Sequence, residues 1–443
     1  MTMFKKIEIW IVGLIVLFFI LIIILVSGVL RDAYLGINQT PIFLRKNLEI
    51  VAEIPKNIYH VTQFFFNRNA PPKLQKHKDK KRFQKYIPYK RNALLVLPRY
   101  DHSISRSVVD IVDLNDFKVI HTYRHDIAAM NDQILITKKF SDIHRDNNQT
   151  RFLYFHPLIF EDGSLISIYG PLYKIDLCSN LQWIKYEKKF HHSLTIDHDG
   201  NIWIPGYMDP KSKYIEKHLN IQNEDSIIKI NTEGKILYEK SVFEILIKNK
   251  LLDDNIFKQG IDPLHLNSIE PALSDTEYWK KGDVFLSLRN QSKIIHYRPG
   301  TDQVISNITG PFAQQHDIQI ISDQEIAIFN NNNFVVDNEY SQIIIYNFET
   351  HKFRTLFNDQ LGKNNFKTYT QGLSHIFKDN ALMVEEQEHG RILLFNNEGE
   401  KEWEFVNKDK NGYIGEVSWS RVIEDETFIK LFKSSVESKK CIN

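Results

Sequence analysis

The sequence has few cysteines and almost no net charge. Cys178 and Cys441 are the two cysteines among 443 residues, and their spacing matches no metal-binding motif. A disulfide framework is therefore excluded, whereas a single bond between these two cysteines is possible but does not follow from the sequence. The formal net charge of +1 provides no overall field that would attract nucleic acid, so we expect no nucleic-acid partner.

The sequence also has few long uncharged runs. One of them, at the N-terminus, is long enough to span a membrane. Residues 10–30 (WIVGLIVLFFILIIILVSGVL) carry no charge and are long enough to cross a bilayer as a helix. Lys5 and Lys6 precede this run, which favours a cytoplasmic N-terminus and an exported remainder. A cleaved signal peptide would have a shorter apolar run and a small-residue cleavage site, so we favour an uncleaved, single-pass anchor in the inner (cytoplasmic) membrane. Whether the anchor is cleaved stays open at this point.

The chain then divides into a connecting region and a long C-terminal domain. We expect an anchor at residues 1–30, a juxtamembrane segment and basic linker at 31–91, and a catalytic domain at 92–443 on the periplasmic side. The linker contains the run KLQKHKDKKRFQKYIPYKR, introduced by Pro71 and Pro72. Such a run contacts anionic headgroups or is a solvated tether, and we favour the tether because the segment is expected outside the cytoplasm.

From Asn92 onward the sequence has little helical periodicity and much short-strand character. Runs rich in Ile, Val, Phe and Tyr alternate with turn clusters such as EDGS, NTEGK and NNEGE, and the pattern repeats about six times with units of roughly 40–50 residues. This predicts an all-β fold, a six-bladed β-propeller preceded by a single N-terminal transmembrane helix. A β-sandwich would not explain the repetition. The closing strand is expected either in GEVSWSRVI or in the strand at Asn92, and residues 241–259 are expected to form a helical insertion.

Histidines recur at the starts of these units. In a propeller the first strand of each blade lines the central channel, so residues at unit starts are candidates for one shared funnel. Each histidine alone is more often structural, but their recurrence favours convergence on the axis. The histidines are His156, His191 with His192, His265, His316 and His375.

Several stretches resemble the bacterial arylsulfate sulfotransferase family from about Phe155 onward. They include HHSLTIDHDGNIW, DPLHLNSIEPA followed by GDVFLSLRNQSKIIHY, and GPFAQQHDIQIISDQEIAIFNN. The resemblance implies a sulfotransferase that moves a sulfuryl group from an aryl sulfate donor to a phenolic acceptor. It further implies a sulfohistidine intermediate and no nucleotide donor, cofactor or metal. Carried over to this sequence, His316 would be the nucleophile; His265, Asn267 and Arg289 would bind the sulfuryl oxygens; and His191 or His192 would complete the pocket.

The chemistry of sulfuryl transfer independently calls for such a set. By analogy with phosphoryl transfer, charge is spread over equatorial oxygens, so catalysis depends mainly on positioning and electrostatics. An Arg fork binds two oxyanion atoms in fixed geometry, and a neutral imidazole is a competent nucleophile near pH 7. We assign no orienting role to Asp317, because neighbours on a strand face opposite ways.

Other interpretations remain open from the sequence. A non-catalytic, membrane-anchored propeller that acts as a binding or scaffold protein is the main alternative, because the fold alone implies no activity. A quinone-dependent dehydrogenase would need periodic Trp motifs, and the six Trp residues show no such period. We expect Trp203, Trp279, Trp403 and Trp419 to serve blade packing, and residues 385–390 (EEQEHG) to form a solvated hairpin. Oligomeric state and the identity of donor and acceptor stay open.

Overall fold

The computed structural model describes residues 9–34, 71–140, 143–217, 221–253, 256, 260–333, 340–439 and 441. The chain forms two compact units: residues 1–69 with 253–261, and residues 70–252 with 262–443. The predicted juxtamembrane segment falls between residues 35 and 70, outside the described residues.

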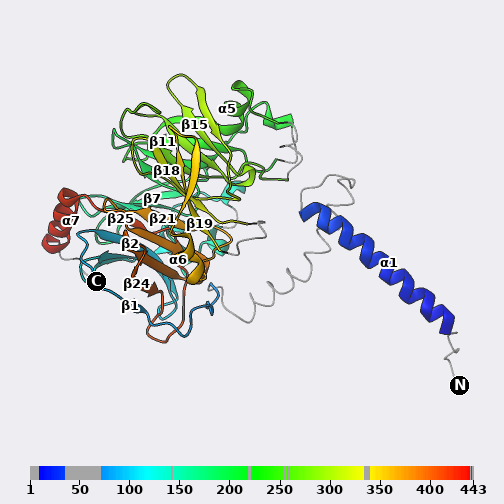
Figure 1. Cartoon of the computed structure of the whole chain (residues 1–443), viewed down its shortest axis with the longest axis horizontal. Coiled ribbons are helices and arrows are strands. Elements are labelled where there is room, and N and C mark those ends of the chain that lie inside the picture. The colour runs from blue at the N-terminus through cyan, green and yellow to red at the C-terminus, as the bar shows by residue number, and fades with distance from the viewer. Residues whose placement is uncertain are drawn as a thin grey trace. The chain divides into compact units, whose positions relative to one another are not determined.

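The described N-terminal part of the first unit is a single helix, α1 (Ile9–Tyr34). Its stretch Ile9–Val29 has a mean hydropathy of 3.5 and is not buried inside the protein. By length and composition this helix could therefore cross a membrane (Figure 1).

The second unit is a six-bladed β-propeller, as predicted (Figure 1). Each blade is an antiparallel sheet whose strands run in order from the channel to the outer edge. Blade 1 contains β25 (Arg421–Ile423), β2 (Leu94–Asp101), β3 (Arg106–Asp113) and β4 (Lys118–Tyr123). Blade 2 contains β5 (Phe155–Ile159), β6 (Leu165–Ile168), β7 (Leu172–Ile175) and β8 (Leu181–Lys185). Blade 3 contains β9 (Thr195–Ile196), β10 (Ile202–Tyr207), β11 (Asp225–Ile230) and β12 (Ile236–Ser241).

Blade 4 contains β13 (Leu266–Pro271), β14 (Val284–Leu288), β15 (Lys293–Arg298) and β16 (Gln303–Ile308). Blade 5 contains β17 (Ile318–Ile320), β18 (Glu325–Asn330), β19 (Gln342–Asn347) and β20 (Lys352–Leu356). Blade 6 contains β21 (Leu373–Ile376), β22 (Leu382–Glu386), β23 (Arg391–Phe395) and β24 (Lys401–Val406), with β1 (Phe83–Lys85) added at its outer edge.

The ring closes in blade 1, where the two ends of the propeller meet. β25 pairs with β2, with Leu94 opposite Ile423 and Val96 opposite Arg421. The closing strand thus lies in GEVSWSRVI, the first of the two predicted positions, and the strand that follows Asn92 is its partner. This pairing covers the inner edge of β2.

The apolar cores lie between neighbouring blades. Because side chains alternate along a strand, Leu94 and Val96 pack with residues of blade 2, whereas Leu95 and Leu97 pack with residues of blade 6. Similar shared clusters join blades 2 and 3, 4 and 5, and 5 and 6. Strands that are buried on both faces have apolar residues at nearly every position. The apolar runs of this sequence have that pattern.

The basic segment before Asn92 is not a solvated tether, so that prediction is wrong. Lys76 and His77 contact Glu386 at 2.5 and 2.8 Å. Arg91 binds Glu402 with both Nε (3.0 Å) and Nη2 (2.6 Å), and β1 pairs with β24. Lys76, His77 and Arg91 thus supply counter-charges to buried carboxylates of blade 6.

The prediction of a solvated hairpin at residues 385–390 is also wrong. Glu385, Glu386 and Gln387 are buried. Glu385 accepts hydrogen bonds from the backbone N–H groups of Trp419 (2.6 Å) and Ser420 (2.8 Å). These residues therefore lie in the interior of blade 6 and not in a solvated hairpin.

Short helices fill the connections. The predicted insertion begins with α5 (Val242–Lys248), capped by Ser241, whose side chain accepts from the N–H of Glu244. It is thus shorter than the 241–259 that periodicity suggested, within the residues described there. The others are α3 (Ile127–Asn131), α4 (Ile143–Asp146), α6 (Asn358–Lys363), and short 3₁₀ turns at Lys138–Phe140, Ile215–Lys217, Arg289–Gln291 and Gln387–His389.

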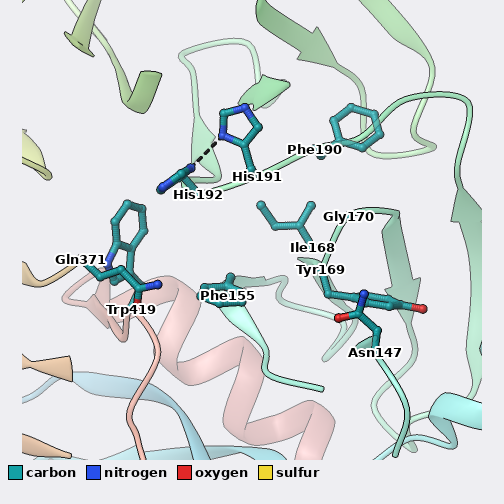
Figure 2. Close-up of a pocket in the computed structure, with 10 residues that line it drawn as sticks. All are labelled: Asn147, Phe155, Ile168, Tyr169, Gly170, Phe190, His191, His192, Gln371 and Trp419. Carbon is teal, nitrogen blue, oxygen red and sulfur yellow. Dashed lines mark hydrogen bonds between the residues drawn. The ribbon is translucent and has the colours of Figure 1, made fainter. Parts of the chain in front are cut away.

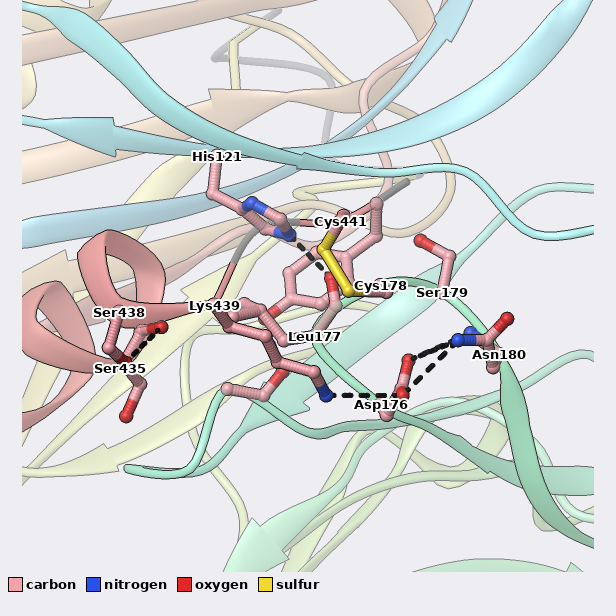
Figure 3. The surroundings of a disulfide bond; sticks show 12 residues. His121, Asp176, Leu177, Cys178, Ser179, Asn180, Ser435, Ser438, Lys439 and Cys441 are labelled. Carbon is pink, nitrogen blue, oxygen red and sulfur yellow. Dashed lines mark hydrogen bonds and ion pairs between the residues drawn. A yellow bond between two sulfur atoms is a disulfide. The ribbon is translucent and has the colours of Figure 1, made fainter. Parts of the chain in front are cut away.

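A C-terminal helix and a disulfide secure the end of the chain. Helix α7 (Glu426–Ser438) starts at the N-cap Asp425 and buries Ile429 and Phe432 in the core shared by blades 1 and 2. Beyond it, Cys441 is bonded to Cys178 in the turn after β7, with the Cα atoms 5.2 Å apart (Figure 3). The possible disulfide of the sequence is thus formed, and it ties the tail to blade 2.

Candidate active site

One residue at the entry of each inner strand has a left-handed backbone. Non-glycine residues rarely adopt positive φ, so six equivalent cases mark one recurring turn, repeated in every blade. The residues are His156 (φ 40°), His192 (60°), His265 (55°), Gln314 (54°), Gln371 (56°) and Trp419 (56°). This turn gives each blade one side chain at the same end of the channel.

Aromatic rings from these turns, together with the ring of His316, form a cluster around His192. Its ring centre lies 5.0 Å from that of His265, 5.8 Å from Trp419 and 6.4 Å from His316. Trp419 also meets the edges of His156 and His316, at 5.6 and 6.2 Å. The structure thus brings together histidines from blades 2, 3, 4 and 5.

His316 is held in a defined tautomer. Its Nδ1 lies 2.6 Å from Oδ1 of Asn331, and its Nε2 accepts a hydrogen bond from the backbone N–H of Gln371 at 3.1 Å. Nδ1 therefore carries the proton and Nε2 the lone pair. Burial, together with the nearby charge of Arg289, lowers the pKa of His316 to about 3, so the ring is neutral near pH 7.

Asn331 fixes this tautomer because its own orientation is fixed. Its amide nitrogen donates to the carbonyls of Thr368 (3.1 Å) and Gln371 (2.8 Å), which leaves Oδ1 as the atom that faces His316. Asn331 is fully buried. Sequence reasoning missed this residue, and the run of asparagines that follows β18 was its one visible signal.

The adjacent pair His191 and His192 is joined ring to ring. The two Nδ1 atoms are 2.7 Å apart, so one of them carries the hydrogen that bonds them. His191 also stacks on Tyr207 at 4.4 Å, and its Nε2 lies 3.5 Å from Oδ1 of the buried Asp225. His192 is therefore the member of the pair that meets the other site histidines.

The remaining expected residues lie around this cluster with partners of their own. His265 Nδ1 lies 2.7 Å from Oδ2 of Asp262, and both side chains are partly exposed. Arg289 donates from Nη2 to Gln314 at 3.1 Å and from Nη1 to Asn290 at 2.8 Å. Burial, followed by the neighbouring groups His191, His265, His316 and Arg289, lowers the pKa of His192 well below its ordinary value.

Asn267 lies deeper than the other expected residues. It is fully buried, and its amide nitrogen donates to the carbonyl of Gln315 at 2.9 Å. Its Oδ1 has no hydrogen-bond partner among the described residues. In this arrangement Asn267 links blade 4 to the turn that carries His316.

An apolar pocket opens beside the histidines (Figure 2). It has a volume of about 240 Å³, with the pair His191 and His192 on one side and Trp419 with Gln371 on another. Its other lining residues are Asn147, Phe155, Ile168, Tyr169, Gly170 and Phe190. The pocket is thus suited to an aromatic group next to His192.

Two expectations about individual residues need correction. His375 does not occupy the funnel position of blade 6; it pairs with Glu424 at 3.2 Å, and Gln371 holds the left-handed position instead. Trp419 is more than a packing residue, since it lines the pocket and contacts three histidines. Neither outcome is visible in the sequence, because which residue of a unit adopts the left-handed turn depends on local backbone geometry.

A cluster of possible metal ligands occurs in blade 3, away from these histidines. Asp197, His198 and Asp199 lie close enough together to share an ion. However, Lys229 Nζ pairs with Asp197 at 2.6 Å and supplies the positive charge there. Asp197 is therefore held in an ion pair of the hairpin.

A comparison with protein-family models matches residues 157–408 to arylsulfotransferase (ASST). This match spans more than half of the chain and contains most of the site residues. The chain belongs to the arylsulfotransferase family. A search among curated proteins found no match.

Solved structures resemble this arylsulfotransferase-family chain only distantly. A protein of unknown function from Bacteroides caccae is 11% identical, with a TM-score of 0.48, covering 75% of this chain and 99% of that one. Virginiamycin B lyase from Staphylococcus aureus is 14% identical, with a TM-score of 0.34, covering 56% and 69%. Hydrazine synthase from Kuenenia stuttgartiensis is 11% identical, with a TM-score of 0.39, covering 66% and 71%. At this level, these likenesses carry no argument about function.

Proposed function

We propose that the protein transfers a sulfuryl group from an aryl sulfate donor to a phenolic acceptor through a covalent intermediate on His316, without a nucleotide donor. The observation that carries this proposal is the tautomer of His316. Its Nδ1–H is bound to Asn331, so the lone pair resides on Nε2 beside the charge of Arg289. A buried neutral imidazole next to a cation is what attack on an anionic sulfate ester needs.

In the first half-reaction, Nε2 attacks sulfur, the S–O bond to the aryl group breaks, and an aryloxide leaves. The N–H of Gln371, which contacts Nε2 at 3.1 Å, gives way when sulfur bonds to this atom. In the second half-reaction, the oxygen of a phenol attacks the sulfur, the N–S bond breaks, the phenolic proton passes to His192, and His316 returns to its neutral form. Arg289 and His265 bind the sulfuryl oxygens in both, whereas Asn267, whose amide nitrogen donates to the carbonyl of Gln315, positions the turn that carries His316.

The aryl groups of donor and acceptor bind in the pocket beside His192. Phe155, Phe190 and Trp419 supply flat apolar walls. A phenol whose ring occupies this pocket has its hydroxyl at the histidine cluster. The pocket therefore favours aromatic acceptors over sugars.

The test is acceptor-dependent release of 4-nitrophenol from 4-nitrophenyl sulfate by the full-length protein. We expect His316→Ala and Arg289→Ala to abolish it, and His375→Gln, a matched histidine variant outside the cluster, to retain it. Full activity in His316→Ala would contradict the nucleophile. Absence of transfer from the wild type to any phenol would favour a non-catalytic propeller.

We also propose that α1 anchors the chain in the inner membrane with the propeller on the periplasmic side. Lys5 and Lys6 before the apolar run and the Cys178–Cys441 disulfide support this, since disulfides persist in oxidising compartments. Protease added to intact spheroplasts should digest the propeller. Protection of the propeller would place it in the cytoplasm.

A further inference from the structure

The proposed reaction moves a proton as well as a sulfuryl group. When a basic aryloxide such as phenolate leaves it takes up a proton, and when the acceptor phenol attacks it releases one. With such a donor the site holds one proton fewer between the two half-reactions than before. The need for a group that stores this proton rests on the proposed function, and the geometry of blade 3 offers such a group.

Three side chains of blade 3 form a line from the centre of the site into the protein. His192 contacts His191 through the two Nδ1 atoms at 2.7 Å, and His191 Nε2 lies 3.5 Å from Asp225 Oδ1. Both His191 Nε2 and Asp225 Oδ1 are buried and have no hydrogen-bond partner among the described residues. A proton held between these two buried atoms satisfies both once they approach from 3.5 Å to hydrogen-bond distance.

This line has two consistent proton arrangements. In the unloaded arrangement Asp225 is ionised, His191 carries its proton on Nε2, and His192 donates from Nδ1, which leaves a lone pair on His192 Nε2. In the loaded arrangement Asp225 is protonated and donates to His191 Nε2. His191 then donates from Nδ1 to His192, and His192 carries its proton on Nε2.

We propose that Asp225 and His191 are a proton store that makes His192 alternately the acid and the base of the transfer. In the loaded free enzyme, His192 Nε2–H protonates the departing aryloxide. The protons along the line each shift by one group, and Asp225 becomes ionised. In the sulfo-enzyme, His192 Nε2 accepts the proton of the attacking phenol, and the line returns to the loaded arrangement. Atoms and charge balance over the cycle, and no further reactant is needed.

The surroundings of Asp225 suit a group that holds a proton. Its side chain is 1% exposed, and Oδ2 accepts the backbone N–H of Leu266 at 3.2 Å. No described cation forms an ion pair with it, apart from His191 when that ring is protonated. Burial, followed by the charge of Asp262, raises the pKa of Asp225 well above its ordinary value.

A second carboxylate–histidine pair in the site provides the matched control. Asp262 lies 2.7 Å from His265, but their side chains are 20% and 26% exposed, so this pair can exchange protons with water. The two Asp→Asn substitutions therefore make the same chemical change in different surroundings. Asp262→Asn changes the solvated pair, and Asp225→Asn changes the buried pair. If the proton is stored on Asp225, only the Asp225 variant changes how the rate depends on the leaving group.

The experiment measures formation of the sulfo-enzyme by the full-length protein in detergent, using 4-nitrophenyl sulfate and phenyl sulfate as donors. Nitrophenolate leaves without protonation, whereas phenolate, from a phenol of pKa about 10, needs the acid. In Asp225→Asn we expect phenyl sulfate to lose at least about tenfold more rate than 4-nitrophenyl sulfate. Asp262→Asn is expected to lower both by the same factor, and His191→Gln to reproduce the donor-selective loss.

A stability measurement separates this role from a structural one. Because Asn cannot be ionised, Asp225→Asn should melt at the same or a higher temperature while losing activity. Equal losses with both donors, or a donor-selective loss in Asp262→Asn instead, would overturn the proton store. If the wild type forms no sulfo-enzyme with either donor, the proposed function itself fails, and that result is distinguishable because it precedes any variant.

Discussion

Two regions of the propeller bury ionisable groups in opposite ways. On blade 6, burial alone would raise the pKa of Glu386, but the hydrogen bond to His77 and the charges of Arg391 and Lys76 lower it to about 2. In the funnel, burial dominates, and it lowers the pKa of both His191 and His316 to about 3. Buried ionisable groups with an oppositely charged partner stabilise the fold. Buried ionisable groups without such a partner keep a shifted pKa and are available for chemistry.

The largest expected effect is on stability, at the paired region. Arg391 Nε lies 2.6 Å from Glu386 and Nη1 lies 3.4 Å from Glu404, and all three side chains are buried. Arg391→Met should lower the free energy of unfolding by about 3–5 kcal/mol, because it removes the fully buried cation and leaves Glu386 and Glu404 with the more exposed Lys76 and Lys401. Arg354→Met, which breaks the exposed pair with Glu325, should cost below about 1 kcal/mol. Urea unfolding of both variants measures the difference, and equal losses would show that burial of the pair is unimportant.

The next effect is on catalysis, in the funnel. Asn331→Ala removes the acceptor that holds the Nδ1 proton of His316, so both tautomers and several ring orientations become available. We expect the rate of sulfo-enzyme formation to fall by about 10²-fold, with little change in the KM of the donor. Stopped-flow release of 4-nitrophenol measures this rate, and an unchanged rate would show that Asn331 does not set the tautomer.

A smaller effect concerns the partly buried Arg421, on which the charges of Glu270 and Asp317 act. Burial raises the pKa of Asp317 from 3.8 to about 7. The folded state therefore binds this proton more tightly than the unfolded chain, and stability falls as pH rises from about 3.8 to 7. Asp317→Asn should remove this loss and raise the free energy of unfolding at pH 8 by about 1–2 kcal/mol. The free energies of unfolding of the variant and the wild type, measured at pH 4 and pH 8, test this prediction. The variant should be more stable at pH 8 and equally stable at pH 4.

The smallest effect concerns substrate choice. Ile168 lines the aryl pocket, and Ile168→Phe would reduce its volume without adding charge. We expect kcat/KM for the two-ring acceptor 2-naphthol to fall about tenfold relative to that for phenol. A parallel loss for both acceptors would mean that the ring binds elsewhere.

The sequence predicted the fold well because the repeat is a property of local patterns. Alternating apolar runs and turn clusters mark each blade, and the clustered histidines were found from their place at unit starts. Contacts between distant segments were not predictable in this way. The basic segment around Lys76 meets Glu386 some 310 residues later, and nothing local to either segment indicates the other.

The details of the site were hidden for a related reason. Three residues of the site come from three different blades, and each contributes a single atom or a ring face. They are Asn331, Gln371 and Trp419. Asp225 looks like an ordinary residue at the start of a strand, and its position opposite His191 follows from blade packing. Residue type and spacing can suggest a nucleophile, but they cannot give the tautomer or the proton path.

The left-handed turn that recurs at His156, His192, His265, Gln314, Gln371 and Trp419 has a consequence for how such a site diversifies. Each position belongs to its own blade, and each blade keeps its own hydrogen-bonded sheet. A substitution at one position therefore alters one sector of the funnel without changing the register of the other five. Substitutions at this end of the propeller can therefore change substrate specificity one blade at a time while the ring stays closed.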